Sequence, residues 1–383
     1  MAKILILGGG TGGLVVANKL ARGLRGTDHE ITLVDRSPYH YFMPSFPWVA
    51  LGFKEPEQVR RPLKNLERKG VRVVHGEVYE IRVSERRVRV NGEDLAYDFA
   101  VVSLGAEVKS DLMPGFNLAY HPWTIEGALQ MREAIRRFQG GRIVIGVSGP
   151  YYRCPPAPYE IAGQLDFALR ARRLRHKSEI ILAHPHPRPL SAMGPAISGV
   201  ITEILASKDV RFEGNFHAQA IDSERQVLIG TDGREIPFDL LIMVPPHQPS
   251  SVGIGLGVTT PAGFPVVDRR TFRYVGDPNM FIIGDMVNPA INLPTAGVMA
   301  HFQAEFVSNQ ILAELKGVYI GESFTPVAMC IMDFGDDAVL PMCDFTRILD
   351  LSGPPSCGVL GRSKAIRLMK MMFESMWFAI YLS

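Results

Sequence analysis

The sequence predicts an α/β fold made of two Rossmann-like domains of the dinucleotide-binding type, followed by an irregular C-terminal segment. Three observations predict it. A glycine-rich turn joins an apolar strand to a helix near the N-terminus, a second strand–loop–helix unit follows near residue 142, and proline and glycine interrupt the pattern from about residue 318. A chain of 383 residues suits two or three domains of this kind.

The first unit begins with a buried strand over residues 3–7, the turn over 8–13 and a helix over 14–24. A strand over 30–34 completes a βαβ unit. Short strands are expected at 71–74 and between 78 and 90, and a buried strand over 99–104 ends at Gly105.

The second unit begins with a helix over 124–138, for which Thr124 is the expected N-cap. Apolar runs predict strands at 142–145, 179–183, 238–244 and 280–283, and a long helix over 294–315. The expected domains are residues 1–108 with 240–316, residues 109–239, and a C-terminal region over 317–383.

Composition excludes several classes. The chain is 46% hydrophobic and 21% charged, as in globular proteins, and its net charge of +2 predicts no nucleic-acid partner. Four cysteines are too few for a disulfide scaffold. The first strand begins at Lys3, so no signal peptide is expected, and no uncharged apolar run reaches the roughly 18 residues that span a bilayer.

The N-terminal turn indicates a dinucleotide site. Gly8, Gly10 and Gly13 match G-x-G-x-x-G between a strand and a helix, where the helix N-terminus binds pyrophosphate. Asp35 ends the next strand, where a carboxylate accepts hydrogen bonds from a ribose. This motif alone does not distinguish FAD from NAD.

Two later segments favour FAD. Residues 102–106, with Gly105, are similar to the strand-to-loop element of flavoproteins that hold two dinucleotides. Gly284 and Asp285 are similar to their second flavin motif, whose aspartate meets the ribityl chain. The following helix, with Gly297 in its first turn, is expected to aim its N-terminus at the flavin.

A second nucleotide site is predicted to be lost. Small residues should follow the strand at 142–145, but Tyr151, Tyr152 and Arg153 stand there and would obstruct a pyrophosphate. The next strand ends in His184 and His186, with no acidic residue to hold a ribose. NADH is therefore not the expected electron donor.

Two cysteines lie in distinctive contexts. Cys154 precedes a proline-rich helix start, where the helix dipole is expected to favour the thiolate; a buried structural cysteine is the alternative. Cys330 lies in an irregular stretch. Four cysteines allow three complete pairings, and their spacing does not choose among them.

These contexts resemble the sulfide:quinone oxidoreductases of the flavin disulfide reductase superfamily. The matching segments run nearly end to end: residues 8–13, 41–48, 154–160, 243–246, 284–285, 330 with 333–336, and 370–374. The cysteine contexts are the specific part, because many flavoproteins share the nucleotide motifs.

The resemblance implies that Cys154 and Cys330 lie on one face of FAD and carry a disulfide or sulfur-bridged pair. Sulfide then leaves a persulfide on Cys154, Cys330 passes two electrons to FAD, and a quinone on the opposite face accepts them. Glu160 is the candidate for proton handling; a carboxylate that only stabilises the first helical turn is equally expected there.

Two departures stand out. Many relatives have a third cysteine where residues 120–125 have none, and relatives often have Pro-Lys where this chain has Pro294 and Thr295. A third-thiol relay and a lysine contact to the flavin are therefore not expected. Cys343 and Cys357 lie outside the matched motifs and are expected to be incidental or structural.

Residues 364–382 predict an amphipathic helix. Lys364, Arg367, Lys370 and Glu374 form a narrow, mainly cationic face and apolar residues cover the rest, which suits a helix lying in a membrane interface. The protein is then a peripheral, monotopic protein of the cell membrane, on a side that the sequence does not assign. The alternative is a helix packed on the body or on a second copy, which leaves a homo-oligomer open. The expected quinone-wall residues are Phe334, Phe345, Phe373 and Trp377.

Three other functions remain as alternatives. The flavoprotein subunit of a flavocytochrome c-type sulfide dehydrogenase has similar cysteine motifs, but would be expected with an export signal and a haem partner. An enzyme like a type II NADH:quinone oxidoreductase needs the second nucleotide loop. A flavin-binding sensor without turnover does not need the two cysteines. Reduction of the flavin by sulfide but not by NADH, followed by its reoxidation with a quinone, separates these from the leading interpretation.

Overall fold

The computed structural model describes residues 1–149, 151–321 and 323–383, and its first domain is built on a six-stranded sheet. The strand order is β19-β20-β9-β1-β2-β5, and every neighbouring pair is parallel except β19–β20. The strands are β1 (Lys3–Leu7), β2 (Glu30–Asp35), β5 (Val71–His75), β9 (Phe99–Val102), β19 (Arg273–Tyr274) and β20 (Asp277–Ile282).

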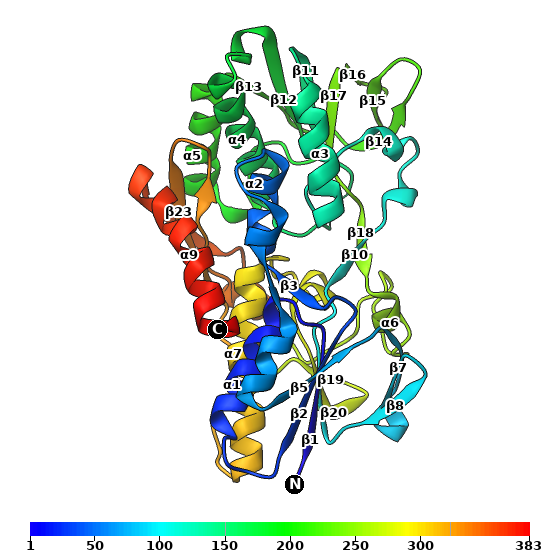
Figure 1. The fold of residues 1–383 in the computed structure, drawn as a ribbon. Coiled ribbons are helices and arrows are strands. Elements are labelled where there is room, and N and C mark those ends of the chain that lie inside the picture. The colour runs from blue at the N-terminus through cyan, green and yellow to red at the C-terminus, as the bar shows by residue number, and fades with distance from the viewer. Residues whose placement is uncertain (150, 322) are drawn as a thin grey trace.

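Helices cover one face of this sheet and a small sheet covers the other. Helices α1 (Thr11–Gly23) and α7 (Gly297–Lys316) lie side by side (Figure 1). The antiparallel strands β6 (Val78–Arg82), β7 (Arg87–Val90) and β8 (Glu93–Ala96) send Val78, Ile81 and Val88 into the same core. Both faces of β1 are therefore buried, which is why its sequence is continuously apolar.

The second domain repeats the arrangement on a smaller scale. Its parallel sheet has the order β13-β12-β11-β17, with α3 (Ile125–Arg137), α4 (Ala157–Ala171) and α5 (Pro195–Ser207) around it. The strands are β11 (Gly141–Val147), β12 (Ser178–Ala183), β13 (Val210–Glu213) and β17 (Leu240–Val244). The Thr124 hydroxyl accepts the Gly127 N–H at 3.0 Å, which confirms the predicted N-cap.

The predicted domain boundary at residue 240 is wrong. Strand β17 pairs with β11, so residues 240–244 complete the second sheet and the chain returns to the first domain after them. The sequence of an apolar strand does not indicate which sheet it joins, because its pairing partner lies far away in the sequence. The return passes through β18 (His247–Pro249), which pairs with β10 (Ala106–Val108) between the two domains.

Short elements complete these two domains. A small antiparallel sheet, β14 (Ala218–Asp222), β15 (Val227–Gly230) and β16 (Glu235–Pro237), packs on the second sheet through Leu228 and Ile236. The first domain also contains β3 (Tyr39–Tyr41), β4 (Arg60–Pro62) and α6 (Ser251–Ile254), whereas α2 (Phe46–Ala50) packs against α3 in the core of the second domain.

The C-terminal region is more regular than expected. It forms an antiparallel sheet in which β23 (Ala338–Asp344) pairs with β21 (Val327–Met329), β22 (Met332–Asp333) and β24 (Ser356–Ser363). A short helix, α8 (Thr346–Leu349), lies between β23 and β24, and the Cys343–Cys357 disulfide joins these two strands. The expectation of an irregular segment is thus wrong, because cross-strand partners rather than local sequence make these strands.

The C-terminal helix α9 (Lys364–Leu382) has the predicted bounds. Its polar face packs against the body, where Lys370 and Glu374 are buried. The residues that face outward are Leu368, Met369, Met371, Met372, Phe373, Met376 and Ile380, each at least 41% exposed. Buried carboxylates elsewhere in the chain pair with Arg367 and Lys370 and hold the polar side of α9 against the body.

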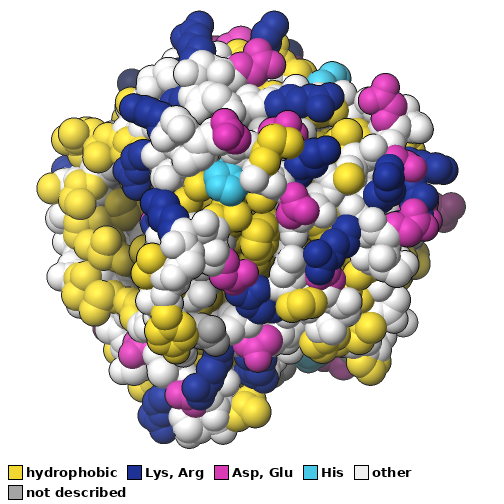
Figure 2. Space-filling model, turned by 90° about the horizontal axis from the view of Figure 1, so that it is seen from below, with side chains coloured by type: hydrophobic (Ala, Val, Ile, Leu, Met, Phe, Trp, Pro, Cys, Tyr) yellow, Lys and Arg dark blue, Asp and Glu magenta, His cyan; other side chains and the backbone are white. Residues whose placement is uncertain are grey.

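An apolar surface results on the side of the molecule where α9 lies. Figure 1 draws α9 at the left, and Figure 2, turned about the horizontal axis, shows hydrophobic side chains gathered at the left edge. Exposed Met329, Met342 and Leu360 from β21, β23 and β24 belong to the same region of the chain as α9. Within the described residues, no helix is long and apolar enough to cross a bilayer.

Candidate active site

The glycine-rich turn between β1 and α1 has the form of a pyrophosphate cradle. A Cβ on Gly8 would lie 2.4 Å from the Ser103 carbonyl oxygen, and one on Gly13 would lie 1.8 Å from the Gly8 oxygen. At Gly10 nothing lies within 4 Å of a Cβ, so the space above the α1 N-terminus is open. Two glycines therefore permit close backbone packing, and the third leaves room for a phosphate.

Substitutions in this turn should separate folding from binding. Gly13→Ala is expected to lower the free energy of unfolding by about 3 kcal/mol, because its methyl group overlaps backbone. Gly10→Ala should fold like the parent chain but release its dinucleotide, because the methyl group enters the open space. Urea unfolding and the cofactor absorbance per mole of protein measure the two effects. A Gly10→Ala protein that keeps full cofactor content would contradict this assignment.

The remaining dinucleotide elements converge near this cradle. The Asp35 carboxylate accepts the backbone N–H groups of Gly9 at 2.5 Å and Ser37 at 2.6 Å, and burial raises its pKa. A Cβ on Gly297 would lie 3.6 Å from Thr11 Oγ1, which places the α7 N-terminus beside that of α1. Helix α7 begins three residues later than predicted, which leaves residues 294–296 outside the helix.

Gly105 and Gly284 both have the positive φ angles, +74° and +75°, that favour glycine. The Gly284 N–H donates to Gln303 Oε1 at 2.7 Å, which fixes the turn that carries Asp285. Asp285 lines a cavity between the two domains together with Ala106. The residues predicted to hold the ribityl side of a flavin are therefore gathered in one place.

Aromatic side chains fill the corresponding region of the second domain. Tyr152 is buried, and its hydroxyl lies 3.2 Å from His184 Nε2 at the end of β12. The rings of Tyr159 and Phe212 pack against His184 in turn, with centroids 5.6 and 6.2 Å away. The prediction that large side chains occupy this nucleotide loop matches the packing.

Cys154 is held in an unusual backbone conformation. Its φ of +61° lies in the left-handed region, which is costly for a residue with a Cβ. The backbone N–H of Cys154 donates to the Thr295 carbonyl at 2.6 Å, and the Thr295 hydroxyl donates to the Tyr152 carbonyl. Thr295, which precedes α7, therefore positions the loop of the second domain that carries Cys154.

Cys330 reaches the same place from the C-terminal sheet. It follows β21, and its N–H donates to the Pro341 carbonyl at 3.2 Å. Both Cys154 and Cys330 are free thiols. Glu160 raises the pKa of each thiol and Lys370 lowers it, so both thiols lie near this pair of charges. The thiol pair named from the sequence is thus brought together, while Cys343 and Cys357 form a separate disulfide.

A buried ionic network connects the thiols to α9. Glu160 of α4 accepts the Asp333 N–H at 2.6 Å and forms an ion pair with Lys370 of α9. Asp333 accepts Trp48 Nε1–H at 2.8 Å and Arg367 Nε–H at 3.0 Å. The helix is therefore attached to the site through its charged side.

A second contact lies one helical turn further along α9. Glu374 accepts the Ser45 hydroxyl and pairs with Lys54 at 2.5 Å. Both partners come from the segment over residues 41–54, which also supplies Trp48. Three charged side chains of α9, Arg367, Lys370 and Glu374, are therefore paired within the protein.

These surroundings keep both thiols protonated, contrary to the expected thiolate at Cys154. Burial raises the pKa of Cys154, Glu160 and Cys330 raise it further, and Lys370 opposes the rise. Burial raises the pKa of Cys330 to about 11, with Glu160 adding to the effect and Lys370 opposing it. Burial and the nearby carboxylate thus outweigh the helix dipole, which is weak beyond the first turn.

Lys370 holds its proton and stabilises the charged form of Glu160. Burial raises the pKa of the Glu160 carboxyl, and Lys370 opposes that rise. Burial acts to lower the pKa of Lys370, but Glu160 and Asp333 outweigh it and raise the value. A carboxyl with a raised pKa beside two thiols can take up and return a proton.

The four predicted quinone-wall residues do not lie together. Phe373 and Trp377 lie 6.1 Å apart, between ring centroids, and Phe42 contacts both at 5.8 and 6.0 Å. Phe334 packs against Gly163 in the second core, and Phe345 lies in the first. The aromatic group under α9 is thus Phe42, Phe373 and Trp377, and Trp377 donates to His40 at 2.9 Å.

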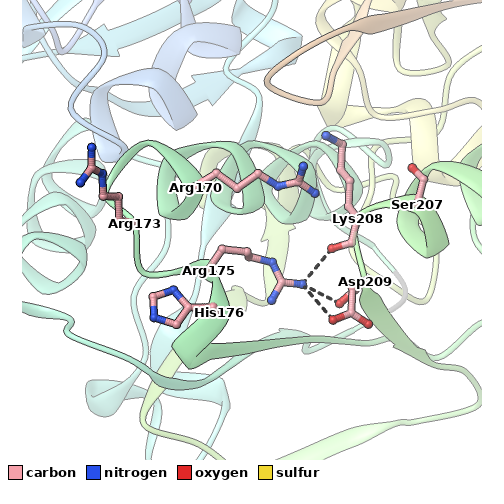
Figure 3. A pocket seen from close by; sticks show the side chains of 7 residues that line it. All are labelled: Arg170, Arg173, Arg175, His176, Ser207, Lys208 and Asp209. Atoms are coloured by element: carbon pink, nitrogen blue, oxygen red, sulfur yellow. Dashed lines mark hydrogen bonds and ion pairs between the residues drawn. The ribbon is translucent and has the colours of Figure 1, made fainter.

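A cavity of about 450 Å³ lies away from the thiols, at the ends of α4 and α5 (Figure 3). Its Arg175 guanidinium donates to the carbonyls of Lys208 and Asp209, both at 2.8 Å, and to Asp166 at 2.9 Å. The Lys208 ammonium pairs with Asp336 and Asp166. Arg175 and Lys208 therefore connect α4 to the end of α5.

A family model described as pyridine nucleotide-disulphide oxidoreductase matches residues 2–304. The chain belongs to this oxidoreductase family. Membership implies a flavin cofactor, which agrees with the open cradle at Gly10 and the gathered Asp285 and Ala106.

Particular members of the family are similar over most of the chain. The sulfide-quinone reductase of Aquifex aeolicus is 26% identical over 360 residues, which cover 88% of this chain and 83% of that protein. The mitochondrial sulfide:quinone oxidoreductase of Mus musculus is 25% identical over 322 residues, 79% of this chain and 68% of that protein. The X-ray structure of the A. aeolicus enzyme shares the fold, with a TM-score of 0.87 and 24% identity over 99% of this chain and 91% of that chain.

The raised thiol pKa predicts how this oxidoreductase reacts with alkylating reagents. In a Cys154→Ser protein, the rate of Cys330 alkylation by iodoacetamide should rise by about tenfold per pH unit from pH 7 to pH 10, because only the thiolate reacts. Mass spectrometry of the labelled peptide measures the rate. The same protein in denaturant should reach a plateau at lower pH; a plateau near pH 8.5 in the folded oxidoreductase would contradict the raised pKa.

Sequence reasoning missed several residues of the oxidoreductase site. Thr295 appeared only as a departure from relatives, yet it holds the Cys154 loop. Lys370 appeared only as part of the cationic face of the C-terminal helix, yet it is the ion-pair partner of Glu160. The sequence did carry a signal for this pair. Lys370 stands among the apolar residues of its helix, and Glu160 has no cationic partner close to it in the sequence.

Proposed function

We propose that this oxidoreductase binds FAD, oxidises sulfide at Cys154 and Cys330, and transfers the electrons to a membrane quinone. The meeting of these two thiols at the Glu160–Lys370 pair, beside an occluded second nucleotide loop, carries the proposal. The named activities of the relatives in Aquifex aeolicus and Mus musculus support it.

The thiol chemistry begins with an oxidised Cys154–Cys330 pair. Hydrosulfide attacks the Cys154 sulfur, a new sulfur–sulfur bond forms, and the old one breaks to leave a persulfide on Cys154 and a thiolate on Cys330. FAD, when bound, supplies a two-electron carrier between the thiols and the quinone. Across the turnover, sulfide sulfur loses two electrons and a quinone gains two electrons and two protons.

Glu160 is placed to handle the protons. Its carboxylate accepts the proton that hydrosulfide or a thiol gives up, and Lys370 stabilises the charged form. The left-handed backbone of Cys154, fixed by Thr295, keeps the attacked sulfur at one position.

Membrane binding follows from the outward face of α9. Seven large apolar side chains of α9, between Leu368 and Ile380, are exposed. Single exposed apolar residues are common on protein surfaces, but a group of this size on one helix indicates an interaction surface. An apolar helix face held on a folded body can enter the acyl boundary of a bilayer. Phe42 and Trp377 are buried beneath that face and contact Phe373 on it, where a quinone arrives from lipid.

Two methionines on this face test membrane binding. Met372→Gln with Met376→Gln should weaken liposome binding by at least about tenfold, because two exposed side chains no longer enter lipid. Thermal unfolding should be unchanged, since both residues are exposed. Tyr79→Gln, at a 60% exposed site on β6, is the control. Unchanged sedimentation with liposomes would rule out α9 as the membrane anchor.

The activity is tested by anaerobic mixing. Sulfide should bleach the flavin absorbance within the time of one turnover, NADH should not, and a water-soluble quinone should then restore it. Extraction of the bound cofactor and its mass identify FAD. Bleaching by NADH would instead favour a type II NADH:quinone oxidoreductase, and restoration only by a haem protein would favour a flavocytochrome c-type partner.

A further inference from the structure

Arg153, immediately before Cys154, is a half-buried cation with no acidic partner. Its Nη2 donates to the Trp123 carbonyl at 2.7 Å and its Nε to His247 Nε2 at 3.4 Å. Its Nη1 points toward Met43 Sδ, at 3.2 Å, on the exposed side. Among the described residues it forms no ion pair with any carboxylate, whereas most other arginines of the second domain do.

The guanidinium lines the cavity between the two domains. Asp285, Thr295 and His247 line the same cavity, and Thr295 is the residue that holds the Cys154 backbone. His247 is itself fixed, because its Nδ1 donates to the Pro245 carbonyl at 2.8 Å and leaves Nε2 to accept from Arg153. The cation is therefore held in place by neutral acceptors where it lines this cavity, in the residue next to Cys154.

A held cation without an acid is costly unless an anion reaches it. Burial acts to lower the pKa of Arg153, and Asp285 and Cys154 oppose that fall, so the group stays charged at neutral pH. A guanidinium binds small anions through several N–H groups at once. Asp285 lines the same cavity, but the hydrogen-bond partners that the structure gives to Arg153 are all neutral, so its charge is not consumed by an ion pair and is available to a ligand.

We propose that Arg153 forms an anion-binding subsite that captures a small anionic sulfur species at Cys154. This inference rests on the proposed oxidation of sulfide for the identity of the ligand. Two sources share the chemistry: hydrosulfide on its way to the Cys154 sulfur, and an anionic thiol or sulfite that removes the sulfane sulfur. Arg153 stands in this chain where the occluded nucleotide loop has lost its phosphate-binding role.

The first test needs no turnover. In a Cys330→Ser protein, where Cys154 is the free thiol, the ratio of alkylation rates with iodoacetate and iodoacetamide reports an anion subsite. Arg153→Gln should lower this ratio by about tenfold, the loss of one charged hydrogen bond, while Arg153→Lys should keep most of it. Arg188→Gln, which removes an exposed arginine from the same domain, should leave the ratio unchanged.

The second test identifies the anion in the holoenzyme. For hydrosulfide, Arg153→Gln should raise the KM for sulfide about tenfold at an unchanged KM for quinone. For an acceptor, the flavin should still be bleached normally by sulfide, and the dependence of turnover on sulfite or glutathione should weaken instead. Either result supports the subsite and names its occupant.

Two results would overturn the subsite. An alkylation ratio that is the same with arginine and glutamine would show that the guanidinium does not attract anions to Cys154. The same unchanged ratio with a reduced FAD content would assign Arg153 to the cofactor beside Asp285. Absence of sulfide oxidation with an intact alkylation ratio would instead refute the proposed function and leave the anion site standing.

Discussion

Serine in place of Cys154 or Cys330 is expected to lower the rate of flavin reduction by sulfide by about 10⁴-fold, the scale of losing a covalent nucleophile. Each thiol is needed, because the disulfide between them is the group that hydrosulfide attacks. Stopped-flow absorbance of the anaerobic holoenzyme measures the rate. Combining both substitutions should cost little more than either one, since the two sulfurs act as a unit.

The matched control is the other cysteine pair. Cys343→Ser with Cys357→Ser removes a disulfide that joins β23 to β24, and it should lower the free energy of unfolding by about 2–3 kcal/mol through the 14-residue separation. Flavin reduction should remain within a few fold of the parent. If this double substitution abolished reduction while Cys154→Ser did not, the assignment of the reactive pair would be wrong.

Methionine in place of Lys370 is expected to destabilise the protein by about 3–5 kcal/mol, because it leaves the Glu160 carboxylate buried without its cation. The site should suffer as well, since Lys370 acts against the rise of both thiol pKa values. Urea unfolding gives the stability, and the pH dependence of Cys330 alkylation should move to still higher pH.

A second substitution separates charge from packing. Glu160→Gln added to Lys370→Met removes the stranded carboxylate and should restore at least half of the lost stability, while activity stays low. Lys364→Met, at an exposed position of the same helix, should have an effect below about 0.5 kcal/mol. Equal losses for Lys364 and Lys370 would contradict the buried ion pair.

Local sequence predicted the βαβ units because their information is local. The strand 3–7, the Gly8–Gly13 turn and the Thr124 cap each depend on residues within one or two turns of one another. The two candidate thiols lie near the same pair of charges, Glu160 and Lys370, and their choice rested on a family resemblance and not on their spacing.

Other features depended on contacts between distant segments. Strand β17 joins β11 across nearly a hundred residues, and Lys370 meets Glu160 across 210, so neither partner is visible locally. The partners of the polar side of α9 were hidden for the same reason: a hydrophobic pattern gives the separation of polar and apolar sides, and only the folded body shows which side packs inward. Likewise, the thiolate predicted at Cys154 from a helix dipole did not take into account two effects that raise the pKa of the thiol. These are its burial and the neighbouring Glu160 carboxylate.

The Glu160–Lys370 pair also sets an order of events during synthesis. Glu160 and Asp333 emerge from the ribosome before Lys370 and Arg367, so both carboxylates must await α9 for their cations. Domains fold as they emerge, N-terminal ones first. The two nucleotide-type domains can therefore form early. The surroundings of Cys154 and Cys330 are complete only when α9 docks and supplies Lys370 and Arg367. The reactivity of the thiols is thus delayed until the helix that exposes its methionines has been made.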